Sequence, residues 1–202
     1  MLEHIRKYHI VLASNSPRRK ELLSGLGLEY EIRTLPGVDE TCPDRLEGGD
    51  IPLYIARKKA VAYKPLLKEN ELMVTADTIV WLDGRVLGKP RDEEDARAML
   101  EAMSGRPHTV YTGVCVTAAA WQRSFVSDTE VRFAKLDREE IDYYVRHFHP
   151  LDKAGAYGVQ EWIGFIGVEY IAGSYFNIMG LPVQRLYKEL KEIDALLAAG
   201  ML

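Results

Sequence analysis

The fold class is decided by the stretch HIVLASNSPRRKELLSGLG, residues 9–27. Its first part, residues 9–13, is an apolar run typical of a buried strand, and a polar Ser-Asn-Ser-Pro segment ends it abruptly. Ser16 is a favourable helix N-cap and Pro17 fits the first helical position. The leucines that follow give the new helix an apolar stripe before the next glycine. This stretch therefore predicts a strand, a loop and a helix in that order.

The rest of the chain repeats this alternation of strand and helix. The apolar runs 72–76 and 79–82 lead to Asp83 and Gly84, which favour a hairpin turn. Asp50, Asp92 and Asp137 precede helical patterns as N-caps. Residues 155–173 are rich in glycine and show no period. We expect strands at 29–34, 72–76, 79–82, 109–118 and 124–133, a surface loop at 36–50, and helices at 51–63, 96–103, 137–148 and from 182 onward.

Composition narrows the class of protein. The 202 residues are 47% hydrophobic and 28% charged, which is typical of one globular domain. The net charge of −4 argues against general affinity for nucleic acid or anionic membranes, so an anionic ligand needs a local basic site. Cys42 and Cys115 fit no metal spacing, and neither a signal peptide nor a membrane span is evident. We expect a cytoplasmic protein.

The segment from Ser14 to Lys20 is the first candidate site. Free backbone N–H groups and the positive end of the helix dipole favour an anion at a helix start. Arg18 and Arg19 add donors that bind phosphate in a bidentate manner. An ordinary capped helix with solvated charges explains the same pattern.

The second candidate is Asp77 with Thr78, placed between two apolar runs. A carboxylate embedded in a strand is costly unless it is paired, hydrogen-bonded or bound to a metal. Lys89 is a third cationic point near the same sheet, and the run 57–59 lies on an expected helix. Solvated charges are the simpler explanation for both. One of residues 57–59 could instead point inward from its helix.

Two later segments offer small and polar groups at bends. Residues 153–160 place a lysine and a glutamine around two glycines that allow a ligand close to the backbone, although a structural loop explains them as well. Residues 173–182 have the same ambiguity. His147 and His149 lie two apart on an expected helix and do not share a face, which disfavours a metal pair. Cationic segments together with acids suit a phosphorylated substrate and a divalent ion.

Several motifs, taken in order, resemble the Maf family of nucleoside triphosphate pyrophosphatases. They are LASNSPRR (12–19), ADTIV (76–80), GKP (88–90), SG (104–105), DKAGAYGVQ (152–160), GSY (173–175) and GLP (180–182). The resemblance implies an α/β fold similar to that of inosine triphosphate pyrophosphatases, with a mixed sheet and flanking helices. It further implies one domain, 1–202, of two lobes around a cleft, a homodimer, and hydrolysis of a nucleoside triphosphate to the monophosphate and pyrophosphate.

The same resemblance assigns roles to individual residues. Asp77 matches the catalytic proton acceptor, and Glu40 resembles a second acid that would help Asp77 to hold Mg²⁺ or Mn²⁺, both of which take oxygen ligands. The residues that would bind the substrate are Ser14, Arg18, Arg19, Lys59, Thr78, Lys89, Lys153 and Gln160.

Three of these positions predict the substrate. Arg18, Thr78 and Gln160 are similar to the branch acting on dTTP and UTP, whereas the sister branch acting on 7-methyl-GTP typically has tryptophan and two acids there. An amide at Gln160 suits a uracil-type edge, because it both donates and accepts. Glu161 departs from the pattern, which predicts glycine after Gln160. Hydrolysis of 7-methyl-GTP and nucleotide sensing in cell division remain as alternatives.

Overall fold

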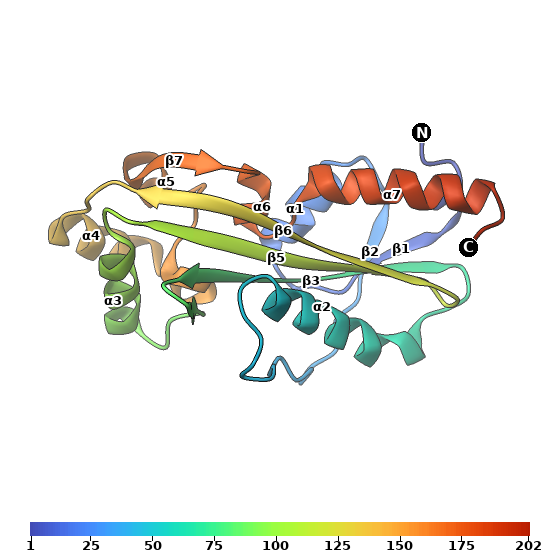
Figure 1. Ribbon diagram of the computed structural model, residues 1–202, viewed down its shortest axis with the longest axis horizontal. Coiled ribbons are helices and arrows are strands. Elements are labelled where there is room, and N and C mark those ends of the chain that lie inside the picture. Colours follow the sequence, from blue (N-terminus) through green and yellow to red (C-terminus); the bar gives the residue numbers. More distant parts are fainter. The chain divides into compact units, whose positions relative to one another are not determined.

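The computed structural model describes all 202 residues and divides the chain into two compact units. Unit 1 comprises Met1–Asp77, Thr112–Ser127 and Gly180–Leu202, and unit 2 comprises Thr78–Tyr111 and Asp128–Met179. Both units combine strands with helices, so the predicted α/β class is confirmed (Figure 1). The expectation of one domain with two lobes and a cleft stays a prediction.

The sheet is mixed, as predicted. β1 pairs in parallel with β2 and β3, whereas the β3–β4 and β6–β7 pairs are antiparallel. The strand order is β2-β1-β3-β5-β6-β7, and β4 pairs with β3. The strands are β1 (His9–Leu12), β2 (Tyr30–Ile32), β3 (Glu71–Leu82), β4 (Arg85–Leu87), β5 (Pro107–Thr117), β6 (Gln122–Phe133) and β7 (Val168–Ala172).

Three of the four helices for which the sequence predicts a side-chain N-cap begin at that cap. Ser16 accepts a hydrogen bond from the Arg19 backbone N–H (3.4 Å), and Asp92 accepts one from the Asp95 N–H (2.8 Å). Asp137 forms a capping box with Glu140. The helices are α1 (Pro17–Ser24), α2 (Asp50–Tyr63), α3 (Glu93–Met103), α4 (Arg138–Phe148), α5 (Trp162–Gly167), α6 (Tyr175–Met179) and α7 (Val183–Ala198), with 3₁₀ turns η1 (Ile5–Lys7), η2 (Lys64–Leu66), η3 (Pro150–Asp152) and η4 (Ala154–Ala156).

Two features of the helices differ from the prediction. Asp50 is not an N-cap: α2 already includes it, and Gly49 stands at the cap without a side-chain bond, so Asp50 contributes only its charge to the first turn. The glycine-rich run contains α5 and β7, with α6 just after it. None of the helices is long and apolar enough to cross a membrane.

Unit 1 buries α2 against its strands. Ala56, Ala60 and Tyr63 of α2 pack on one face of β1, β3 and β5, while α7 lies on the other side of these strands (Figure 1). The contact of α2 with β5 is very close at Gly113, where an added Cβ would lie 2.4 Å from the backbone of Pro52. Only glycine therefore lets this helix reach its position.

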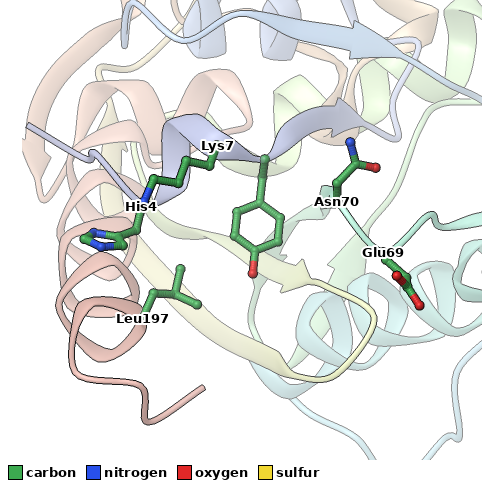
Figure 2. Close-up of a pocket in the computed structure, with 6 residues that line it drawn as sticks. His4, Lys7, Glu69, Asn70 and Leu197 are labelled. Atoms are coloured by element: carbon green, nitrogen blue, oxygen red, sulfur yellow. The ribbon is translucent and has the colours of Figure 1, made fainter.

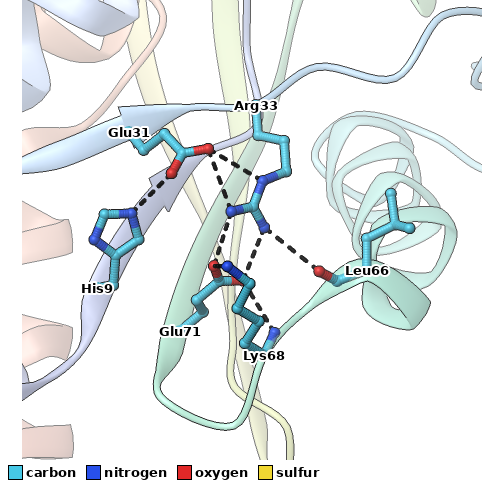
Figure 3. Close-up of polar contacts among 6 residues, drawn as sticks. All are labelled: His9, Glu31, Arg33, Leu66, Lys68 and Glu71. Carbon is cyan, nitrogen blue, oxygen red and sulfur yellow. Dashed lines mark hydrogen bonds and ion pairs between the residues drawn. The ribbon is translucent and has the colours of Figure 1, made fainter.

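An ion pair fastens the edge strand of unit 1. Arg33, just after β2, donates from Nη1 and Nη2 to the two carboxylate oxygens of Glu71, each at 2.8 Å (Figure 3). Glu71 is fully buried at the start of β3 and also accepts from the Lys68 backbone N–H (3.0 Å). Hydrogen bonds from Arg33 lower the pKa of Glu71 to about 2. Glu31 of β2 joins Arg33 to His9 at the exposed end of this network.

Unit 2 is built around a buried aromatic group. His108, Phe133 and Tyr157 meet edge to face, with ring centroids 5.0–5.4 Å apart. The His108 ring is 2.8 Å from the Tyr157 hydroxyl, and burial lowers the pKa of His108 to about 4. The histidine is therefore neutral at ordinary pH. It fixes Tyr157, which lies within the predicted 153–160 segment.

Candidate active site

A lysine joins two acids in unit 1. The Lys59 ammonium, on α2, lies 2.8 Å from Asp77 Oδ1 on β3 and 3.0 Å from Glu40 Oε1 in the preceding loop. Lys59 and Asp77 are largely buried, with side chains 12% and 13% exposed, whereas Glu40 is 57% exposed. The expected cost of a carboxylate within a strand is thus offset by an ion pair. We refer to these three residues as the acid–lysine cluster.

Neighbouring residues fix the loop that carries Glu40. Lys58 donates to Asp39 Oδ2 (2.6 Å) and to the Thr41 carbonyl (2.9 Å), and Asp39 also accepts from the Thr41 backbone N–H (2.8 Å). The hydrogen bond from Lys58 lowers the pKa of Asp39 to about 2. Arg57 turns away and donates to Ser124 Oγ (2.7 Å). One residue of the 57–59 run therefore points inward, as considered from the sequence.

The loop before α1 presents a second set of polar groups in unit 1. Arg19 donates from Nε to the Gly180 carbonyl (2.8 Å), and its Nη1 lies 3.5 Å from Ser14 Oγ. Burial lowers the pKa of Arg19 from its ordinary value, and the charge of Asp77 opposes this shift. These contacts fix the direction of the guanidinium beside Ser14. Arg18 is half-buried beside it on the first turn of α1.

In the acid–lysine cluster two carboxylates lie within reach of one ammonium, and carboxylate oxygens are the ligands that Mg²⁺ and Mn²⁺ prefer. Mg²⁺ usually takes only one or two carboxylates and completes its shell with water and phosphate oxygens. Glu40 and Asp77 fit that pattern. The chain has no group of three or more His, Cys, Asp and Glu side chains arranged to hold a metal ion.

Unit 2 contains a second lysine between two acids. The Lys153 ammonium lies 2.7 Å from Asp152 Oδ1 and 3.1 Å from Glu161 Oε1. The Tyr144 hydroxyl of α4 donates to the other Glu161 oxygen, Oε2, and accepts from the Gly158 backbone N–H (3.0 Å). Burial is the main cause that raises the pKa of Tyr144, so the hydroxyl keeps its proton. The segment 153–160 is thus a bonded structure, not a free loop.

Gln160 is among the residues that have a buried side-chain atom without a hydrogen-bond partner. Its side-chain oxygen, Oε1, is buried and accepts no hydrogen bond. A buried acceptor without a donor costs about 1–3 kcal/mol, and such a group is expected where a ligand supplies the donor. Thr78 is half-buried at the start of the unit 2 part of β3, and Lys89 is exposed just after β4.

A pocket of about 310 Å³ opens elsewhere in unit 1. Figure 2 shows the side chains of His4 and Lys7 on one side of it, with Asn70 and Glu69 on the other and Leu197 of α7 below. None of the residues predicted for the site lines this pocket. It is therefore separate from the acid–lysine cluster.

Sequence reasoning missed some residues that hold the site. Two adjacent acids and two adjacent lysines form the ion pairs Asp39–Lys58 and Glu40–Lys59, but the partners are distant in sequence and no local pattern pairs them. Tyr144 is not among the residues that the sequence singles out. Glu161 stood out as a departure from the family pattern, but nothing in the sequence indicated its partners.

The chain thus combines an α/β fold with a buried strand carboxylate, Asp77, that pairs with a lysine. A model of the Maf-like protein family matches residues 9–193, so the chain belongs to this family.

Relatives with 45–65% identity bear one name, dTTP/UTP pyrophosphatase. The protein of Phocaeicola vulgatus is 65% identical over 96% of this chain and 100% of its own length. That of Bacteroides fragilis is 61% identical over the same shares. That of Flavobacterium johnsoniae is 45% identical over 93% of this chain and 96% of its own.

Solved structures give more distant matches. The Ham1 protein of Staphylococcus aureus aligns with a TM-score of 0.45 and 17% identity, over 62% of this chain and 72% of that chain. A HAM1 protein from Coxiella burnetii aligns with a TM-score of 0.45 and 18% identity, over 92% of this chain and 99% of that chain.

Proposed function

We propose that this chain is a nucleoside triphosphate pyrophosphatase that hydrolyses dTTP and UTP to the monophosphate and pyrophosphate. The names of its full-length relatives support this activity. The observation that carries the chemistry is the acid–lysine cluster, in which a buried carboxylate, a buried ammonium and a more exposed carboxylate converge. Cleavage of a phosphoanhydride needs charge shielding and an oriented water molecule, and these groups supply both functions.

Asp77 is the proposed proton acceptor. Lys59 holds its Oδ1 atom, so the direction of the carboxylate is fixed before substrate arrives. A water molecule that attacks the α-phosphorus loses a proton to Asp77 as its oxygen bonds to phosphorus, and the bond to the pyrophosphate oxygen breaks. The Lys59 ammonium lies beside the reacting carboxylate and opposes the negative charge that develops.

Glu40 and Asp77 are the proposed ligands of a divalent cation, Mg²⁺ or Mn²⁺. Such an ion, when bound, shields the phosphate charges and lowers the barrier to nucleophilic attack. The exposure of Glu40 leaves room for water and phosphate oxygens around the ion. The Asp39–Lys58 pair keeps the Glu40 loop in place.

Gln160 is proposed to read the pyrimidine base. Its buried, unsatisfied Oε1 matches the N3–H donor of thymine and uracil, and its amide N–H₂ matches a base carbonyl. Arg18 and Thr78 complete the pyrimidine set by family resemblance. Ser14, Arg19, Lys89 and Lys153 are proposed to bind the phosphates, as a cationic and hydroxyl set suits them.

A homodimer, which the family resemblance supports, and the cytoplasmic location expected from the sequence are also part of the proposal. Light scattering at several protein concentrations tests the first point: twice the chain mass at all of them is expected. A constant single-chain mass would remove the dimer from the proposal without affecting the chemistry.

Pyrophosphate release from dTTP, UTP, CTP, GTP and 7-methyl-GTP tests the activity, with Mg²⁺, with Mn²⁺ and with a chelator. We expect metal-dependent release of pyrophosphate and monophosphate, with dTTP and UTP as the best substrates. A preference for 7-methyl-GTP would overturn the substrate assignment. Binding without turnover of any nucleotide would instead favour a sensor.

Substitution of Gln160 by Ala tests base recognition in the same assay. We expect kcat/KM for dTTP and UTP to fall about tenfold, because the amide supplies hydrogen bonds that a methyl group cannot. Pyrophosphate release from CTP and GTP should change little, so the preference for dTTP and UTP over CTP and GTP should decrease. An equal loss with all nucleotides would contradict a role in reading the base.

A further inference from the structure

Glu161 stands where the family resemblance predicts glycine, and its side chain is fully engaged in unit 2. One oxygen pairs with Lys153 (3.1 Å) and the other accepts from the Tyr144 hydroxyl. The two partners come from different elements: Tyr144 from α4 and Lys153 from the turn between η3 and η4. The carboxylate therefore ties a phosphate-binding candidate to a rigid helix.

The local backbone is fitted to this carboxylate. An added Cβ on Gly158 would lie 2.7 Å from the Glu161 Cδ, and the Gly158 N–H donates to the same Tyr144 hydroxyl that reaches Glu161. Gly155 is similarly confined, because a Cβ there would lie 2.8 Å from a methyl group of Val80. The segment thus holds Glu161 and Lys153 in one defined arrangement.

The direction of the Lys153 ammonium follows from its partners. The side chain is only 9% exposed, and an ammonium carries three N–H groups. Asp152 takes one at 2.7 Å, and Glu161 defines a second direction. The four bonds of an ammonium nitrogen are tetrahedral, so the C–N bond and the hydrogen bond to Asp152 together fix the other two N–H directions. Glu161 attracts the ammonium from one side as an ion pair, and the remaining N–H is the one assigned to a phosphate oxygen.

We infer that Glu161 is a positioning residue that aims Lys153 at the polyphosphate of the substrate. This role rests on the proposed function only in taking Lys153 as a phosphate ligand. Glu161 itself would not touch the nucleotide, since both its oxygens are engaged within the protein. Its contribution comes from preorganisation of a donor before the ligand binds.

A double-mutant cycle on phosphate binding tests this role. The four proteins are the wild type, Glu161→Gln, Lys153→Gln and the double variant, and the probe is tripolyphosphate, measured by calorimetry with Mg²⁺ present. We expect Lys153→Gln to weaken binding about tenfold, as for a lost charge-assisted hydrogen bond. Glu161→Gln should weaken it about threefold to fivefold alone and not at all in the Lys153→Gln background, because it acts through that lysine.

Two further variants separate positioning from general loss of structure. Glu161→Gly restores the family-like residue at a position with extended backbone (φ −100°, ψ 176°) that glycine adopts freely, and it should weaken binding at least as much as Glu161→Gln. Glu169→Gln removes a carboxylate from an exposed pair with Arg132 (2.9 Å) in the same unit and should leave binding unchanged.

Each other outcome contradicts the inference. Equal weakening by Glu161→Gln with and without Lys153 would show that it does not act through the lysine. A lowered Tm with unchanged tripolyphosphate binding would give Glu161 a purely structural role, and a wild type that fails to bind tripolyphosphate would remove the premise. Hydrolysis of dTTP by the wild type is measured in parallel, so a failure of the proposed function is recognised separately from a failure of this cycle.

Discussion

The two units each place a lysine between two carboxylates, but they do so differently. In unit 1 the less exposed acid, Asp77, is part of a strand, and the more exposed acid, Glu40, comes from a loop. In unit 2 the less exposed acid, Glu161, also binds a tyrosine, and the more exposed acid, Asp152, is the sequence neighbour of the lysine.

This difference separates two uses of the same charges. Glu161 has both oxygens occupied by protein donors, so it can orient a lysine but has little capacity to accept a proton from substrate water. Asp77 has one oxygen assigned to Lys59 and takes part in a cluster with a solvent-exposed acid. A buried carboxylate is therefore interpreted as reactive or structural according to how its second oxygen is used.

Replacement of Asp77 by Asn should have the largest effect. We expect kcat for dTTP to fall about 10³-fold, within the range for loss of a general base, while binding of a non-hydrolysable dTTP analogue changes little. Steady-state kinetics and calorimetry measure the two quantities. Retained turnover would remove Asp77 from the role of proton acceptor and with it the contrast between the two units.

Glu71 is a buried, ion-paired carboxylate outside the proposed site, so its replacement by Gln provides a comparison for Asp77. Loss of one partner from the buried Arg33 pair should lower the free energy of unfolding by about 3 kcal/mol at pH 7, and kcat should be unchanged below the melting transition. Urea unfolding measures the loss. A large fall in kcat of the folded protein would show that ion-pair loss alone disables the enzyme.

The same variant predicts a pH dependence. The pKa of Glu71 is lowered from about 4.5 to about 2, so its stabilisation is complete above about pH 4.5 and is lost as the pH falls toward 2. The wild type should therefore lose stability faster than Glu71→Gln across this window. If the unfolding free energies of the two proteins depended on pH with the same slope, Glu71 would not be the source of this pH dependence.

Glu40 and Asp152 form a matched pair for a smaller effect, because they are 57% and 58% exposed and each contacts a lysine. Glu40→Gln should raise the Mg²⁺ concentration needed for half-maximal activity about tenfold, the low end of the effect of a lost contact near a metal. Asp152→Asn should leave that concentration unchanged. A shift of similar size in both variants would mean that Glu40 acts only through charge.

Much of the fold follows from local signals in the sequence. Ser16 and Asp92 cap their helices as predicted, since a short polar side chain before an apolar stripe has few other uses. The Asp83-Gly84 turn gives the predicted hairpin. α5 and β7 were not predicted, because glycines at their ends and centre remove the periodic signal. Their form depends on close backbone packing that no period marks, such as the approach of Gly164 to the backbone of Val159, where an added Cβ would lie 1.9 Å from the carbonyl oxygen.

In the candidate site too, some residues follow from local sequence signals and others do not. Asp77 was singled out because its charge conflicts with its apolar neighbours in the strand, and the structure supplies the partner that such a conflict requires. The roles of Lys58 and Glu161 depend on residues distant in sequence or on another element, so no local pattern marks them. A charged residue among apolar neighbours can be recognised in the sequence, whereas the partner that neutralises it is found only in the structure.

Gly113 has a consequence for how this protein can change over time. Because Gly113 has no Cβ, α2 can pack closely on β5, and this packing places Lys59 of α2 near the strands. Even the smallest side chain there would displace the helix that carries the lysine, without altering any polar residue. Substitutions at position 113 should accordingly occur together with substitutions in the first turn of α2. A substitution at position 113 alone should reduce activity although this residue is not part of the site.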